Sequence, residues 1–217
     1  MKNTFSVKKM VLLAMLAAVA YMMGSLIRVP IVLFLKYEPK DVIITIGGFL
    51  LGPMASFIIS LVVSLLEMVT ISDTGPIGAI MNLLSTCTYA CTAAFIYKKK
   101  HTLNGAVVGL GVGTVVMSAA MLLWNYLITP LYMTGTSRSD IAGMLIPVFL
   151  PFNLLKAGLN SAFILALYKP LVTALRKTGL IPEQKSGSGG SKVGLYLFAG
   201  GLLITCILLV MVMQGKI

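Results

Sequence analysis

The sequence predicts an all-α integral membrane protein with six or seven membrane-spanning helices. Two observations lead to this fold class. Hydrophobic residues make up 58% of the 217 residues, charged residues make up 11%, and the mean hydropathy is +0.99, whereas soluble domains carry about 25% charged residues. In addition, several uncharged apolar runs are about 17–25 residues long, the length of a helix that crosses roughly 30 Å of hydrocarbon. These runs lack the period-two alternation of a barrel strand, and in lipid a helix satisfies its own backbone hydrogen bonds.

The first third of the chain divides into two long helices and a shorter apolar stretch between them. The first helix is predicted over Val7–Ile27, a loop over Pro30–Lys40, and the third segment over Met54–Thr70. The stretch between them, Asp41–Leu51, is short for a full span and ends at Gly52-Pro53, where proline blocks helix continuation. No convincing processing site follows the N-terminal lysines, so we expect the first segment to remain as a helix.

The rest of the chain contains three more long apolar runs and one detached run. After a turn-rich loop at Ser72–Pro76, the predicted elements are a helix at Ile77–Tyr97, a helix at Leu103–Ile128, a polar loop at Thr129–Asp140, a helix at Pro147–Leu175 and a final run at Val193–Met213. The stretch Ser186–Ser191 is typical of a flexible linker. We therefore divide the chain into a six-helix membrane domain (1–178), a linker (179–192) and an accessory C-terminal transmembrane helix (193–217). Because the last run has almost no polar atoms, we expect it to face lipid.

The positions of the cations predict the orientation. Lys8 and Lys9, the Lys98–Lys100 cluster, and Arg176 with Lys177 fall on one side if six segments cross before the linker. The positive-inside rule makes that side the cytoplasm and places the N-terminus there. This assignment requires the short second segment to count as a crossing. It also explains the formal net charge of +11 without a nucleic-acid partner.

Polar residues within the apolar runs indicate a binding site. Polar side chains are costly in a membrane and commonly mark a pathway or a pocket. Five of them lie at a similar depth, in the outer third of the membrane under the predicted topology: Glu67, Asn82, Asn125, Asn153 and Lys156. They can converge only on a pocket that opens outward.

The residue types constrain the ligand. Three carboxamides offer paired donors and acceptors, which suits a neutral heterocycle with amide or imide edges. Lys156 and Glu67 are the one cation and one anion predicted at membrane depth, which argues against a multiply charged ligand. Flat apolar surface for a ring is predicted from Tyr37, Trp124, Tyr126 and Phe152.

Each of these residues also has a structural interpretation. Asn82 could bond between helices, and Glu67 and Lys156 could form a structural ion pair. Lys156 could instead extend toward the membrane surface, and Trp124 and Tyr126 could belong to an interfacial aromatic belt.

Other functional classes find little support in the sequence. The three cysteines, Cys87, Cys91 and Cys206, lie in apolar runs, and with a single histidine in the chain they form no metal-ligand set, so we interpret them as packing residues. The sequence offers no nucleophile–base pair or nucleotide-binding loop, so an enzyme is not expected. It also lacks the duplicated halves of a self-sufficient carrier.

At these positions the chain resembles the riboflavin-specific S components of energy-coupling-factor (ECF) transporters. The matching stretches are Leu35–Val42, Gly48–Pro53, Ser72–Gly78, Trp124–Tyr132 and Pro151–Lys156, and the resemblance covers residues from about 7 to 178. The Trp-Asn and Phe-Asn-x-x-Lys blocks are the specific parts of this pattern.

The resemblance implies a six-helix subunit in the cell membrane that binds riboflavin as its transported ligand and carries no cofactor and no ATPase. Its partners would be a membrane-spanning coupling subunit and two cytoplasmic ATPases, with the coupling subunit docking at Ala14 and Ala18.

The resemblance assigns the flavin ring to Asn125, Asn153 and Lys156. Further ligand contacts are implied at Lys36, Tyr37 and Asn82, and we expect Glu67 to accept bonds from ribityl hydroxyls or to balance Lys156. The C-terminal helix departs from the family's six-helix pattern. Two alternatives stay open: an S component for another vitamin or heterocyclic precursor, and a structural membrane protein.

Overall fold

The computed structural model describes residues 7–33, 35–71, 75–132, 135, 137–177 and 192–213. Its elements, in chain order, are α1 (Val7–Leu26), β1 (Val29–Val32), β2 (Leu35–Tyr37), α2 (Lys40–Leu51), α3 (Pro53–Thr70), α4 (Gly75–Lys100), α5 (Leu103–Tyr132), α6 (Arg138–Met144), the π-helical turn η1 (Leu145–Phe149), α7 (Leu150–Lys177) and α8 (Lys192–Met213). The predicted turn residues 72–74 and linker residues 179–191 lie outside the described residues.

The all-α membrane fold is confirmed. Five helical stretches of the described chain are long and apolar enough to cross a membrane: α1, α3, α4, the stretch Leu103–Leu131 and the stretch Arg138–Tyr168. Helix α8 follows as a further 22-residue apolar helix. The starts and ends of α1 and α3 agree with the prediction to within one residue.

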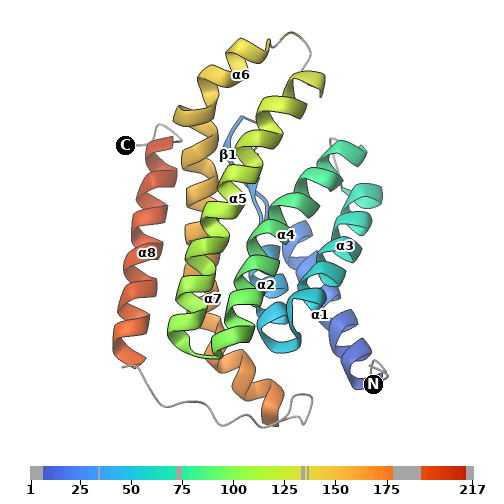
Figure 1. Ribbon diagram of the computed structural model, residues 1–217, viewed down its shortest axis with the longest axis vertical. Coiled ribbons are helices and arrows are strands. Elements are labelled where there is room, and N and C mark those ends of the chain that lie inside the picture. The colour runs from blue at the N-terminus through green and yellow to red at the C-terminus, as the bar shows by residue number, and fades with distance from the viewer. Residues whose placement is uncertain are drawn as a thin grey trace.

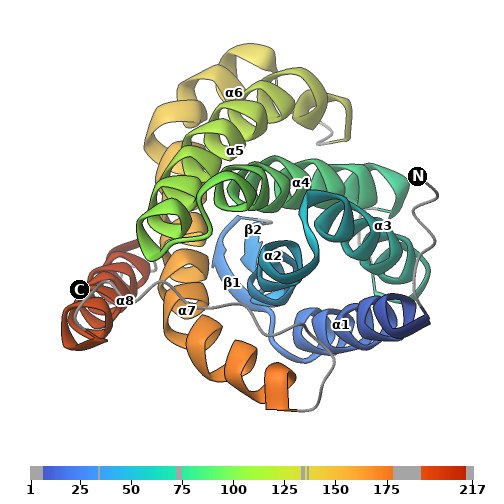
Figure 2. The same ribbon diagram turned by 60° about the horizontal axis from the view of Figure 1, so that its bottom comes forward.

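The short helix α2 stands in the middle of the bundle. Figure 2 shows it surrounded by α1, α3, α4 and α7, and it packs against all four. None of its 12 residues is exposed, which explains why its sequence is apolar on all sides apart from Lys40, Asp41 and Thr45. The chain rises along α1 and returns through the β-hairpin and α2 (Figure 1).

Small residues bring the helices into close contact around α2. A Cβ atom at Gly48 would lie 2.0 Å from Ser56 Oγ and 2.8 Å from the Cβ of Ala94. Between α4 and α5, a Cβ atom at Gly109 would lie 2.7 Å from the backbone oxygen of Ala93. Glycine at these positions permits the close approach that packing in lipid depends on.

Two segments predicted as loops are ordered structure. The predicted loop Pro30–Lys40 overlaps an antiparallel hairpin of β1 and β2, in which Pro30 pairs with Lys36. The strands were missed because the pairing is only a few residues long. The predicted polar loop Thr129–Asp140 is partly helical, since α5 continues through Pro130 to Tyr132. Helix α6 begins at Arg138 under a capping box formed by Ser137 and Asp140.

The two ends of the bundle differ, and we name them by what lies there. The N-terminus, the end of α4 and the end of α7 share one end, the N-terminal end; the end of α3 and the start of α4 lie at the other, the pocket end (Figure 1). At the N-terminal end the rings of Phe49 and Tyr97 stack with centroids 4.5 Å apart, and Tyr97 hydrogen-bonds to Tyr168. These aromatic side chains fill the bundle there.

Candidate binding pocket

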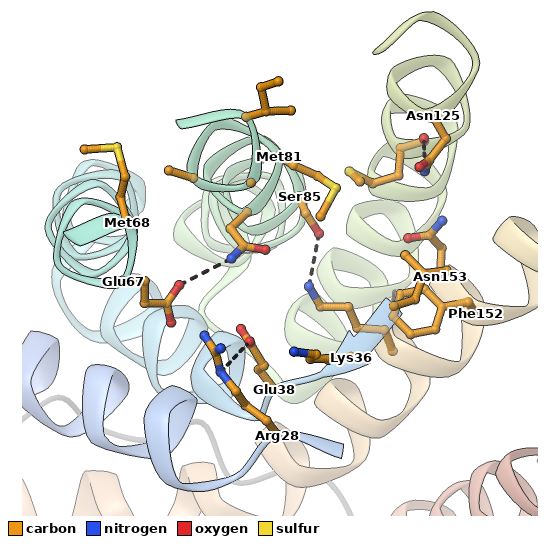
Figure 3. A pocket seen from close by; sticks show the side chains of 17 residues that line it. Arg28, Lys36, Glu38, Glu67, Met68, Met81, Ser85, Asn125, Phe152 and Asn153 are labelled. Atoms are coloured by element: carbon orange, nitrogen blue, oxygen red, sulfur yellow. Dashed lines mark hydrogen bonds and ion pairs between the residues drawn. The ribbon is translucent and has the colours of Figure 1, made fainter. Parts of the chain in front are cut away.

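A cavity of about 310 Å³ lies at the pocket end, between the hairpin and helices α3, α4, α5 and α7. It is lined by charged, amide and apolar side chains: Arg28, Leu35, Lys36, Glu38, Glu67, Met68, Ile77, Gly78, Ala79, Met81, Asn82, Ser85, Met121, Asn125, Phe152, Asn153 and Lys156. Figure 3 shows Asn125, Asn153 and Phe152 on one side and Glu67 on the other, with Lys36 below them.

The structure brings together six of the seven residues predicted to contact the ligand. The five polar residues expected at one depth, Glu67, Asn82, Asn125, Asn153 and Lys156, all line this pocket. Lys36 joins them from the hairpin.

The aromatic residues are placed differently from the prediction. Tyr37 is buried behind the pocket wall, where its hydroxyl donates to Asn160 Oδ1 at 3.1 Å. Trp124 packs against the core, and Tyr126 is exposed on the surface of the bundle. Of the four aromatic side chains proposed to face a ring, only Phe152 lines the pocket.

The two pocket carboxamides on α5 and α7 are oriented by their own helices. Asn125 Nδ2 donates to the backbone oxygen of Met121 at 2.7 Å, and its Oδ1 accepts from Thr129 at 2.9 Å. Asn153 Nδ2 donates to the backbone oxygen of Phe149 at 2.8 Å. Both amides are buried, so their hydrogen bonds hold them in one orientation against the cavity.

The lysine of the pocket is paired with Asp41, which was predicted to begin the short apolar stretch and was not assigned to the site. Lys156 Nζ lies 3.1 Å from Asp41 Oδ2 and donates to Ser85 Oγ at 3.2 Å. Asp41 is fully buried at the start of α2 and also accepts hydrogen bonds from Thr86 (2.7 Å) and Asn160 (3.3 Å). A buried carboxylate needs such a cation and such donors, because leaving it unpaired in a low dielectric is costly.

The predicted alternative of a Glu67–Lys156 ion pair is wrong. Glu67 instead forms an ion pair and hydrogen bond with Lys40, and its Oε2 accepts from Asn82 at 3.3 Å. Lys40 also pairs with Glu38, which lies 3.1 Å from Arg28. The prediction of a single cation and a single anion at this depth is therefore also wrong.

Three cations and three anions are matched around the pocket. Arg28 pairs with Glu38, and Lys40 pairs with both Glu38 and Glu67. Lys156 pairs with Asp41. The network is close-packed against α1, since a Cβ atom at Gly24 would lie only 2.7 Å from Glu67 Oε1. These six charges balance one another, and Lys36 adds a further cation to the lining, so the reason first given for a neutral ligand does not hold.

The sequence carried one signal for Asp41 that was not used. Lys40 and Asp41 directly precede an apolar run and form the first turn of α2. Their burial depends on the hairpin folding back into the bundle, a long-range event that the local pattern does not reveal.

The residues predicted to dock a coupling subunit lie on the surface. Ala14 and Ala18 are exposed on α1, whereas Leu13, Leu16 and Ala17 on the opposite face pack into the bundle. The small exposed residues leave room for another helix to approach at this face.

Comparison with known proteins places the chain in a family. Residues 8–168 match the family described as "ECF transporter, substrate-specific component". The chain belongs to this family. It is thus a multi-pass membrane protein of a transport family, and the predicted resemblance to the S components of ECF transporters is confirmed.

Individual relatives agree with this assignment. The chain is 30% identical to "Riboflavin transporter RibU" of Staphylococcus aureus (strain TCH60) over 178 residues, which cover 78% of this chain and 93% of the relative. It is 28% identical to "Riboflavin transporter FmnP" of Bacillus subtilis (strain 168), covering 69% of this chain and 84% of the relative. A solved S component of a bacterial ECF transporter superposes with a TM-score of 0.65 at 30% identity, covering 78% of this chain and 98% of that one.

Proposed function

We propose that this S component binds riboflavin at the pocket end and passes it to an ECF coupling subunit driven by two ATPases. The observation that carries the proposal is the pocket itself, in which Asn125, Asn153 and Lys156 meet beside Phe152. Relatives named riboflavin transporters support the choice of ligand.

The flavin ring is assigned to the side of the pocket formed by α5 and α7. Its imide edge offers one N–H donor and two carbonyl acceptors, which the amides of Asn125 and Asn153 and the ammonium of Lys156 complement. Phe152, Met81 and Met121 supply apolar surface for the ring faces. The cavity of about 310 Å³ falls within the range of small-molecule pockets.

The ribityl chain is assigned to the opposite side, near Glu67, Asn82 and Lys36. Glu67, Asn82 and Lys36 all line this side of the cavity, so a carboxylate, an amide and an ammonium are present for the ribityl hydroxyls. Tyr37, which lies behind the wall, acts through Asn160 and Asp41 rather than on the ligand directly.

The orientation follows from the same assignment. The pocket end faces the outside, and the N-terminal end, with Lys98–Lys100 at the close of α4, faces the cytoplasm. The coupling subunit docks at the exposed face of α1 around Ala14 and Ala18. Residues 1–178 form the binding domain in this proposal, with the C-terminal helix attached to it through residues 179–192.

The test is the spectrum of the purified protein in detergent. We expect flavin absorbance in the visible region to copurify, or quenching of added riboflavin fluorescence that saturates at one ligand per chain. A thermal-shift screen of other vitamins and heterocyclic precursors runs beside it. Stabilisation by one of these and none by riboflavin would contradict the proposal and identify the ligand class that replaces it.

A further inference from the structure

Helix α8 has no role in the family pattern. The family match ends at residue 168, and α8 begins at Lys192. Because 78% of this chain already accounts for 98% of the solved S component, that relative has almost no residues left to form a corresponding helix.

Helix α8 packs on the bundle along α7. Figures 1 and 2 both show it beside α7, on the side of the bundle away from α1. Ala199 and Cys206 are buried at this contact, while Leu197, Ile204 and Leu208 are exposed. The approach is close, since a Cβ atom at Gly158 of α7 would lie 2.9 Å from Cys206 Sγ.

The contact extends to the β-hairpin. Cys206 belongs to one apolar cluster with Ile31, Leu35 and Tyr37 of the hairpin, and Leu202, Leu203 and Val210 of α8 pack against the same cluster. An isolated two-stranded hairpin is marginally stable, so it depends on such packing for a fixed position.

Two routes lead from this cluster to the pocket. The first is apolar: Leu35 of the hairpin and Phe152 of α7 belong to the cluster and also line the pocket. The second is polar: Tyr37 donates to Asn160, which donates to Asp41, the partner of Lys156.

We propose that α8 is a support for the pocket wall: by packing on α7 and the hairpin, it holds Leu35, Phe152 and the Tyr37–Asn160–Asp41 chain in place and slows ligand release. This inference rests on the proposed function for its ligand. Lipid could fill the same space, but its mobile chains would not fix the hairpin in one position.

The position of α8 is tested first, without any ligand. The distance between Cβ and Sγ across a disulfide is about 3 Å, given an S–S bond of about 2.04 Å. The test variant is Gly158→Cys in the full chain, with Cys87→Ala and Cys91→Ala to remove the other thiols. Its new cysteine should form a disulfide with Cys206 on treatment with copper phenanthroline, the oxidant that takes two electrons from the two thiols as they lose two protons. Loss of both free thiols without dimer formation supports the contact; two free thiols after oxidation would overturn it, whatever the ligand is.

The effect on the pocket is tested with a matched pair. Gly158→Leu places a side chain against Cys206, whereas Gly201→Leu adds the same side chain on α8 where nothing lies within 4 Å. We expect riboflavin to dissociate about fivefold faster or more from Gly158→Leu, and at the wild-type rate from Gly201→Leu. Equal rates for the two variants would overturn the proposal.

If Gly158→Leu does not fold, the cross-linked variant decides. Riboflavin should leave the oxidised Gly158→Cys protein more slowly than the reduced one, and equal rates would overturn the proposal. If wild-type protein binds no riboflavin, the proposed function fails while the cross-linking result still stands.

Discussion

The pocket end and the N-terminal end of the bundle use opposite kinds of interior. The pocket end buries three matched pairs of charges around a cavity. The N-terminal end is filled by stacked aromatic rings and by glycine contacts between α4 and α5. The difference indicates that polar groups are retained where a ligand must be recognised and that close packing closes the opposite end. Substitutions at the pocket end should therefore change binding, and those at the N-terminal end should change stability alone.

The largest effect is expected from Asp41→Asn. It leaves the buried Lys156 ammonium without its counter-ion, which should lower the free energy of unfolding by about 3–5 kcal/mol and abolish riboflavin binding. Thermal unfolding and fluorescence titration measure the two effects. The double variant Asp41→Asn with Lys156→Met removes the unpaired charge and should regain most of the stability without regaining binding. Wild-type affinity in the single variant would show that Asp41 does not position Lys156.

A second prediction concerns packing at the N-terminal end. Gly109→Val places side-chain atoms against the backbone of Ala93, which cannot move aside easily, and should cost about 1–3 kcal/mol of stability. Gly111→Val, on the same helix with nothing within 4 Å, is the matched control. Affinity of the folded fraction for riboflavin should be unchanged in both. A large loss of affinity in Gly109→Val would break the division between the two ends.

Asn125→Ala sharpens the same division from the pocket side. Removing a buried amide that the proposed site assigns to the flavin ring should weaken riboflavin binding by about 1–3 kcal/mol. Asn104→Ala, an exposed asparagine on the same helix near its other end, should leave the affinity unchanged. Isothermal titration in detergent compares them, and equal affinities would remove Asn125 from the site.

The smallest effect is expected from Tyr168→Phe. It deletes the hydroxyl that bonds to Tyr97 while keeping the ring, so it should lower the stability by about 0.5–1.5 kcal/mol. Binding should not change. A shift in riboflavin affinity larger than the shift in stability would mean that the aromatic end communicates with the pocket.

The long helices and the gathering of pocket residues could be predicted from the sequence, because both depend on local features. The lengths of the apolar runs predict the helices, and the position of a polar residue within its run predicts its depth in the membrane. Asn125 and Asn153 were placed together by this reasoning. The ion-pair partners could not be predicted. Asp41 lies where the hairpin returns to the bundle, and only the folded hairpin decides that its carboxylate meets Lys156 rather than water.

The same limit explains why a helix was predicted to begin at Pro147, whereas in the structure the helical chain runs from α6 through η1 into α7. Pro147 lacks the N–H group that a regular α-helical hydrogen bond needs. The wider π-helical turn η1 accommodates it and connects α6 to α7 without a break. A proline in an apolar run is compatible with a helix start or with such a turn. The prediction chose a helix start, and the packing of Phe149 against the hairpin cluster favours the turn.

The enclosed position of α2 affects how the protein adapts to bilayers of different thickness. Its 12 residues span about 18 Å, less than the hydrocarbon core, and none of them is exposed to lipid. Mismatch between protein and bilayer therefore acts on the surrounding helices, which respond by tilting. Asp41 is carried inside that ring, so the anion that pairs with Lys156 is kept away from lipid, whereas the pocket residues on α3, α4, α5 and α7 lie on the helices that adapt to the bilayer.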